Sequence, residues 1–146
     1  MSEQRIQQAI QLIDEINQCD PVSETVDGIA QPKEWLYGVR MSECLAEFMP
    51  EASTALQIAA RAQHIKRWSI PRSEHPLGRE GYNQWRQSLG RLHAEEAMAI
   101  AEKVGCAQDE VQSNGRMLRK EKLKRDTQVC LLYTNDRSPR RTRAGQ

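Results

Sequence analysis

Residues 52–68 read ASTALQIAARAQHIKRW, and this stretch constrains the fold more than any other. Its alanines, at positions 52, 55, 59, 60 and 62, favour an α-helix and let neighbouring helices approach closely. The pattern predicts a helix from about Ala52 to Trp68 that packs tightly against other helices. A single histidine, His64, lies near its end among basic and aromatic residues.

The composition also favours helices. Apolar residues make up 38% of the 146 residues and aromatic residues only 5%, so the core must be built from aliphatic side chains, which suits packed helices better than a β-sandwich. The length is enough for one domain that buries a core without disulfides. The four cysteines are far apart and form no Cys-x-x-Cys pair, which predicts reduced, mostly buried thiols.

Hydrophobic spacing and Pro or Gly punctuation divide the chain into five helices. We expect them at about residues 3–18, 32–49, 52–68, 79–104 and 108–120, with a polar loop between the first two. The predicted fold class is therefore all-α, a single-domain orthogonal helical bundle over residues 1–130.

The end of the chain differs from the rest. Residues 134–146 hold four arginines and no large apolar residue, so we expect residues 131–146 to form a disordered basic tail. The N-terminus has no apolar signal core, and no apolar run approaches the length of a membrane span. We expect a soluble, cytoplasmic protein without membrane partners.

Charge is unevenly distributed along the chain. Residues 1–60 carry 3 basic and 10 acidic side chains, whereas residues 61–146 carry 18 basic and 10 acidic ones. The basic half can attract phosphate-bearing ligands through its summed field. The alternative is a solvated surface, or pairing between the two halves.

His64 is the first candidate for chemistry. Arg61, Arg67 and Trp68 share its side of the predicted helix, where an imidazole can ligate a metal or transfer protons and guanidinium groups can hold phosphate or carboxylate. The structural alternative is a buried histidine bonded to a carbonyl, with its arginines paired to the acidic half.

His93 is the second candidate, because it interrupts the apolar stripe of the long fourth helix. Glu96 follows one turn later on the same face, and His-x-x-Glu on a helix can supply two ligands to one metal. We therefore predict His64 and His93 as catalytic residues. Together with Glu96 they are the candidate ligands of a divalent transition metal.

Further arginines and aromatic residues surround these histidines. Aromatic rings can stack on a base or a cation, although they are also common core anchors. The predicted substrate-binding residues are Arg61, Arg67, Trp68, Arg72, Tyr82, Trp85 and Arg86.

Several motifs carry a family resemblance. They are LYGxRM at residues 36–41, AARAQHIxRWxIPR at 59–72, GYxxWR at 81–86, LHA at 92–94 and LKRD at 123–126. In this order they resemble the domain-of-unknown-function family 4202 over about residues 3–130. The resemblance implies an all-helical domain without an established activity.

A more distant resemblance is to the HD-type metal-dependent phosphohydrolases, in which a small-residue helix ends in a His-Asp pair. His64 takes the histidine position, Ile65 stands where that pattern has its metal-binding aspartate, and Arg40 lies near the expected first histidine. The resemblance implies an HD-like helical fold and phosphohydrolase-like chemistry.

The chain departs from the 4202 family after Asp126, where members continue into an apolar final helix. We hypothesise that a frameshift or truncation removed that helix, which would uncover apolar surface and favour self-association.

Two functions from different classes follow. The first is a metal-dependent phosphohydrolase-like activity on a phosphorylated small molecule or nucleotide. The alternative is a non-catalytic module that binds RNA or a nucleotide, or an inactive truncated relative.

Overall fold

The structure, a computed structural model, describes residues 2–119. Its elements are α1 (Ser2–Asn17), β1 (Ser23–Val26), β2 (Ile29–Pro32), α2 (Lys33–Phe48), α3 (Thr54–Arg61), the 3-10 turns η1 (Arg67–Ser69) and η2 (Arg72–Glu74), α4 (Gly78–Lys103) and α5 (Gln108–Leu118). The predicted all-α helical bundle is confirmed for these residues. The predicted tail, the lost final helix and the frameshift hypothesis concern residues outside them.

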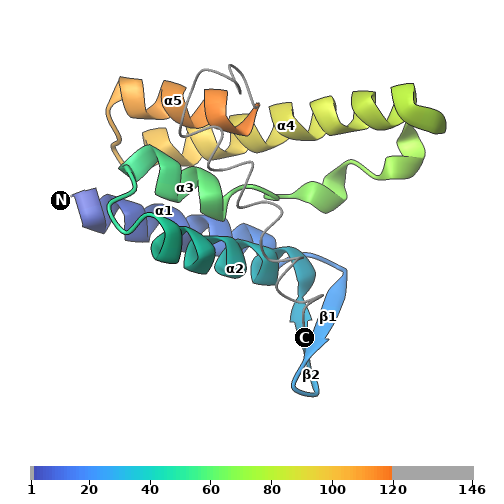
Figure 1. The fold of residues 1–146 in the computed structure, drawn as a ribbon, viewed down its shortest axis with the longest axis horizontal. Coiled ribbons are helices and arrows are strands. Elements are labelled where there is room, and N and C mark those ends of the chain that lie inside the picture. The colour runs from blue at the N-terminus through green and yellow to red at the C-terminus, as the bar shows by residue number, and fades with distance from the viewer. Residues whose placement is uncertain (1, 120–146) are drawn as a thin grey trace.

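The short helix α3 lies between the other helices and forms the middle of the core (Figure 1). Its Leu56 and Ile58 are fully buried, together with Ile13 of α1, Met41 of α2 and Met117 of α5. Burying a side chain of this size contributes about 1.5–3 kcal/mol. The stretch that marks the fold in the sequence is therefore also the centre of the packing.

Local sequence explains where α3 begins and how closely it packs. The Ser53 hydroxyl accepts a hydrogen bond from the Leu56 amide at 3.1 Å and so caps the helix. Ala59 and Ala60 are fully buried, as expected of small residues at a close helix crossing. A methyl group added at Gly38 of α2 would lie 2.9 Å from the Arg61 carbonyl oxygen, so α2 and α3 pack almost backbone to backbone.

The predicted end of this helix was wrong. The structure ends α3 at Arg61, not at Trp68, and Lys66 adopts a left-handed conformation with φ of 56°. The buried Asn17 side chain, at the end of α1, accepts a hydrogen bond from the Lys66 amide at 3.2 Å and so holds the chain in this turn. A tertiary contact thus overrides the helical propensity of residues 62–68.

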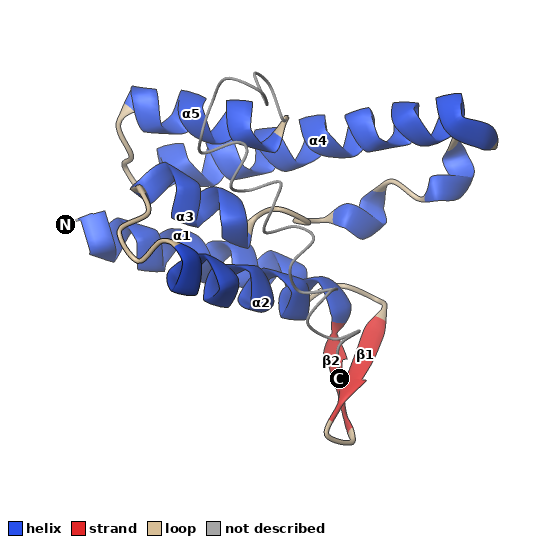
Figure 2. Ribbon diagram, in the orientation of Figure 1, coloured by secondary structure: helices blue, strands red, loops and turns tan. Residues whose placement is uncertain are grey.

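A β-hairpin replaces the predicted polar loop between the first two helices and projects from the bundle (Figure 2). Strands β1 and β2 are antiparallel, with Ser23 opposite Pro32 and Val26 opposite Ile29. The two turn residues, Asp27 and Gly28, have φ of 51° and 79°, as a two-residue hairpin turn requires. An Asp-Gly pair is typical of such a turn, but the strands are too short and too exposed to show clear alternation.

The last two helices agree with the predicted ranges within two residues. Asn114 and Gly115 lie within α5, and both are buried packing residues. The Asn114 side-chain amide donates to the Ala55 carbonyl at 2.8 Å, and Gly115 faces Met98 so closely that a methyl group would clash. The segment between α3 and α4 runs outward and enters the projecting N-terminal end of α4 (Figure 1).

Two smaller expectations concern cysteines and membranes. Cys19 is exposed, and Cys44 and Cys106 are only partly buried, so the expectation of mostly buried thiols is wrong for these three. All three are free thiols. Among residues 2–119, no helix has the length and apolar character needed to cross a membrane.

Candidate acid–base site

His64 lies in the turn that follows α3, where it meets a carboxylate of α2. Its Nδ1 is 3.0 Å from Oε1 of Glu34, and both side chains are largely buried. Glu34 belongs to the first turn of α2, where the helix dipole favours a negative charge. A carboxylate that accepts from Nδ1 leaves Nε2 as the nitrogen that exchanges protons, which is the usual arrangement of a histidine base.

Asp20 fixes the first turn of α2. Its Oδ2 accepts from the Glu34 amide and its Oδ1 from the Val22 amide, each at 2.9 Å. Pro32, the residue before α2, offers no side-chain cap, so the buried Asp20 supplies the missing acceptor from outside the helix. The same contact sets the position from which Glu34 reaches His64.

Tyr37 holds the other side of the imidazole. Its ring stacks on that of His64 with centroids 3.7 Å apart and an interplanar angle of 6°. Tyr37 follows Glu34 by three residues, so both side chains leave the same face of α2. Helix α2 therefore fixes both the hydrogen bond of the His64 side chain and the orientation of its ring plane.

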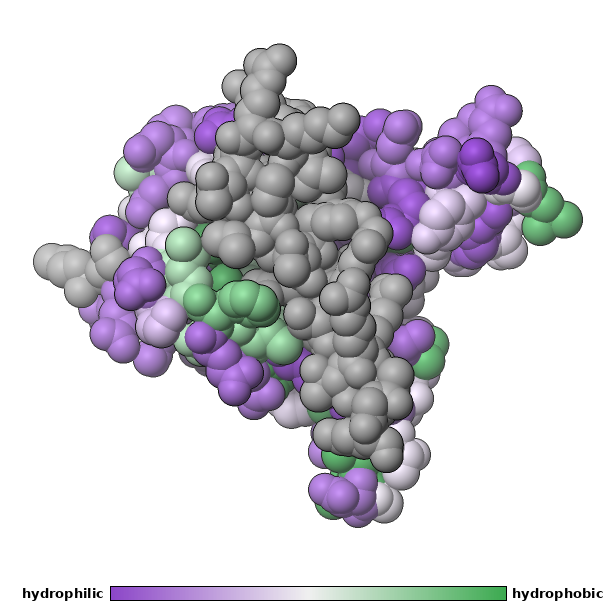
Figure 3. All heavy atoms as spheres, viewed as in Figure 1, coloured by the Kyte–Doolittle hydropathy of each residue, from purple (hydrophilic) through white to green (hydrophobic). Residues whose placement is uncertain are grey.

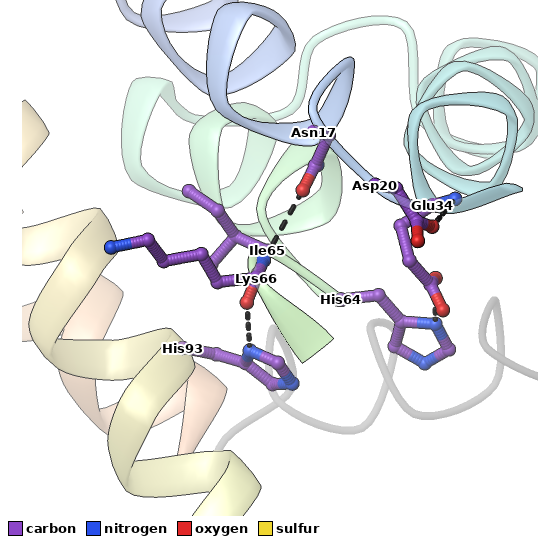
Figure 4. A network of polar contacts seen from close by, with 7 residues as sticks. All are labelled: Asn17, Asp20, Glu34, His64, Ile65, Lys66 and His93. Atoms are coloured by element: carbon purple, nitrogen blue, oxygen red, sulfur yellow. Dashed lines mark hydrogen bonds and ion pairs between the residues drawn. The ribbon is translucent and has the colours of Figure 1, made fainter. Parts of the chain in front are cut away.

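His93 reaches the same place from α4 (Figure 4). Its ring centroid is 6.2 Å from that of His64. Its Nδ1 donates to the Ile65 carbonyl at 2.8 Å, because a carbonyl can only accept. In the neutral ring the proton therefore sits on Nδ1 and the lone pair on Nε2.

The turn of residues 64–66 connects the two histidines. His64 carries one imidazole, Ile65 offers the carbonyl that orients the other, and Lys66 is tied to Asn17 (Figure 4). Both histidines thus have Nδ1 bonded to the protein, and both depend on the same three residues. The sequence placed the histidines 29 positions apart without showing this link.

Burial and charge act on Glu34 in opposite directions. Burial raises the pKa of its carboxyl above the ordinary value, and the positive charges of Arg67 and Lys33 lower that pKa in part. Burial is the larger of these opposing effects, so the charged form of the carboxyl group that contacts His64 is less favoured than it is in water.

Two of the predicted site residues form ion pairs elsewhere. Arg61 donates two hydrogen bonds to Asp14 of α1, at 2.9 and 2.7 Å. This agrees with the alternative prediction that the arginine pairs with the acidic half of the chain. Glu96 lies 3.6 Å from the Lys66 ammonium group. Among residues 2–119, no three His, Cys, Asp or Glu side chains form a group that could hold a metal ion. The metal assignment stays a prediction.

The other predicted residues lie along the outer part of α4 and the segment before it. Arg67 stacks over the Trp85 ring, with its guanidinium carbon 5.2 Å from the ring centroid, and Trp85 Nε1 donates to the Ile70 carbonyl at 2.7 Å. Arg72 and Arg86 both lie 5.9 Å from the centroid of Tyr82. Trp68 is partly buried beside them in η1.

Glu34, Asp20, Tyr37 and Asn17 are the site residues that sequence reasoning missed. Tyr37 stood inside a family motif, but the motif gave it no role. Nothing in the spacing of Glu34 and His64 predicts their contact, which depends on the close packing of α2 against α3 at Gly38 and on the Asp20 contact with the start of α2.

Comparison with known proteins supports the family and nothing finer. Neither the curated proteins nor the solved structures include a match to the chain. The family described as domain of unknown function (DUF4202) matches residues 7–135, which is most of the chain. The chain therefore belongs to the DUF4202 family.

Proposed function

We propose that the chain is a phosphoester hydrolase that uses His64 and His93 for acid–base catalysis. One observation carries the proposal: a histidine bonded to a buried glutamate lies 6.2 Å, ring to ring, from a second histidine whose Nδ1 is also held. Two oriented imidazoles at this separation can serve the attacking and the leaving oxygen of one phosphate. The phosphohydrolase-like resemblance points to the same reaction class.

In this mechanism His64 is the general base. Its Nε2 removes a proton from a water molecule, whose oxygen forms a bond to phosphorus, while Glu34 stabilises the resulting imidazolium. The bond between phosphorus and the ester oxygen breaks. His93, protonated at Nε2 and bonded through Nδ1 to the Ile65 carbonyl, gives its proton to that leaving oxygen.

Arg67 is the arginine best suited to bind the phosphate. Its charge lowers the pKa of Glu34, the carboxyl group that contacts His64, and its guanidinium group lies over the Trp85 ring. A guanidinium group in this place stabilises the negative charge that builds up on the phosphate in the transition state. We propose this anion site for a phosphorylated small molecule or nucleotide.

The mechanism uses only protein side chains and includes no step on a metal. The residues present among 2–119 do not fit a metal of the HD type, because Ile65 replaces the expected aspartate and Glu96 is paired with Lys66. We propose a cytoplasmic location, since three free thiols suit a reducing compartment.

The test is turnover of p-nitrophenyl phosphate and bis(p-nitrophenyl) phosphate by purified protein, with and without EDTA. His64→Asn and His93→Asn should each lower the rate about 10²–10⁴-fold, the usual contribution of one acid or base. His75→Asn, a histidine outside the site, is the matched control and should retain the rate. Equal rates in the wild type and all three variants would refute the proposal. Loss of the rate in EDTA and its recovery on addition of a transition metal would show that the reaction depends on a metal.

A further inference from the structure

A row of arginine and aromatic side chains leads away from the histidine pair along α4. We call it the α4 surface and define it by Arg67, Arg72, Tyr82, Trp85 and Arg86. Arg67 links the two regions, because its guanidinium group lies over the Trp85 ring and its charge lowers the pKa of Glu34. The Trp85 and Tyr82 centroids are 5.8 Å apart, so the row is continuous from the site to the outer end of the helix.

Helical spacing puts this row on one side of α4. Tyr82, Trp85 and Arg86 are at positions i, i+3 and i+4, and Arg86 donates to the Tyr82 hydroxyl at 3.0 Å. Arg72 arrives from the segment before α4, where it donates to the carbonyls of His75 and Pro76 at 3.2 and 2.9 Å. The hydrogen bonds from Arg72 to the loop and from Trp85 to Ile70 hold these side chains in place.

The row is positively charged and exposed in part, because Arg67, Arg72 and Trp85 are half-buried. Tyr82 is 42% exposed and Arg86 is exposed. The row holds three arginines, Arg67, Arg72 and Arg86, and no acidic residue. The projecting end of α4 carries mostly hydrophilic residues in the space-filling view (Figure 3). An exposed ring between guanidinium groups suits a ligand that alternates aromatic planes with negative charges.

We propose that the α4 surface binds single-stranded RNA and leads its phosphodiester to His64 and His93. Bases would stack on Tyr82, and the arginines would contact successive phosphates, as in sequence-tolerant single-strand binding. A free mononucleotide would occupy only one part of this row. The substrate class rests on the proposed function, while binding by the surface does not.

The proposed chemistry selects RNA over DNA. In RNA the neighbouring 2′-hydroxyl takes the place of water as the nucleophile, so the same base and acid suffice without a metal. His64 takes the 2′-hydroxyl proton, the 2′ oxygen bonds to phosphorus, the bond to the 5′ oxygen breaks, and His93 protonates that oxygen. The products are a 2′,3′-cyclic phosphate and a 5′-hydroxyl end.

Fluorescence anisotropy with a labelled 12-nucleotide RNA and its DNA copy tests the surface. Both strands should bind and a duplex should bind less, because stacking needs unpaired bases. Tyr82→Ala should weaken binding about 5–100-fold and Tyr82→Phe, which keeps the ring, only slightly. Arg86→Ala should lower the salt slope by about 0.7. Arg91→Ala, on the opposite side of α4, removes the same charge and should have a smaller effect.

Gel analysis of the same strands tests the substrate class. RNA should be cut to cyclic-phosphate ends and DNA left intact. Absence of binding, or equal loss in Arg91→Ala and Arg86→Ala, would overturn the α4 surface. Equal cutting of DNA would overturn RNA as the substrate. If the protein binds RNA but cuts neither RNA nor the p-nitrophenyl esters, the proposed function alone is refuted. If it cuts the p-nitrophenyl esters but does not bind RNA, the α4 surface alone is refuted.

Discussion

The polar groups around His64 and those of the α4 surface are held in opposite ways. Around His64, buried groups are bonded to one another or to backbone atoms, as in the contacts of Glu34, Asp20 and Asn17. On the α4 surface, guanidinium groups lie over rings that stay partly exposed. The first arrangement keeps a fixed geometry, and the second lets a ligand replace one stacking partner with another. The fold thus separates an oriented site from an adaptable surface.

The largest expected effect comes from replacing Glu34, which orients His64. Glu34→Gln keeps the shape but removes the charge that stabilises a protonated His64, so the rate on p-nitrophenyl phosphate should fall about 10²-fold or more. RNA binding should change less than threefold. A variant that loses binding and keeps the rate would contradict the division of roles.

Substitutions at two glycines compare the close packing of α2 against α3 with the looser packing around Gly90 of α4. Gly38→Ala places a methyl group 2.9 Å from the Arg61 carbonyl oxygen, and overpacking of this kind costs about 1–3 kcal/mol in the free energy of unfolding. Gly90→Ala on α4 meets its nearest atom at 3.4 Å and gains helix propensity, so stability should stay level or rise by about 1 kcal/mol. Urea denaturation measures both. Equal losses would show that α2 and α3 do not cross as closely as described.

Asn17 tests whether the turn of residues 64–66 positions both histidines. Asn17→Ala leaves the Lys66 amide without its partner, which should cost about 1–3 kcal/mol in stability and change the imidazole NMR signals of His64 and His93. Gln18→Ala, the exposed neighbouring residue, is the control. Loss of stability with unchanged imidazole signals would leave Asn17 a purely structural role.

The smallest effect concerns pH and Glu34. Because burial raises its pKa, the folded state keeps this proton to a higher pH than the unfolded chain does. Its contribution to stability is therefore full below the ordinary carboxyl pKa and is lost as the pH rises through the raised pKa. The difference in unfolding free energy between wild type and Glu34→Gln should fall across this window. A rise would show that attraction to His64 and Arg67 outweighs burial.

The sequence predicted what depends on local pattern. Helix α4 was predicted, and both histidines were singled out as candidates, because periodicity, glycines and an interrupted apolar stripe mark them directly. The end of α3 was missed because Asn17, 49 residues before Lys66, holds the turn. Glu34 was missed because its partner is 30 residues away and is brought close by the packing of α2 against α3. Contacts of this kind arise from tertiary structure and have no local signature.

The histidine tautomers test the central claim most directly. Long-range ¹H–¹⁵N NMR spectra distinguish a proton on Nδ1 from one on Nε2 in each neutral imidazole. Glu34 and the Ile65 carbonyl both accept from Nδ1, so His64 and His93 should carry their protons there, whereas the Nδ1 of His75 has no hydrogen-bond partner and sets no such preference. Glu34→Gln should change the signal of His64 and leave that of His93. Protons on Nε2 of His64 and His93 would contradict the acid–base site.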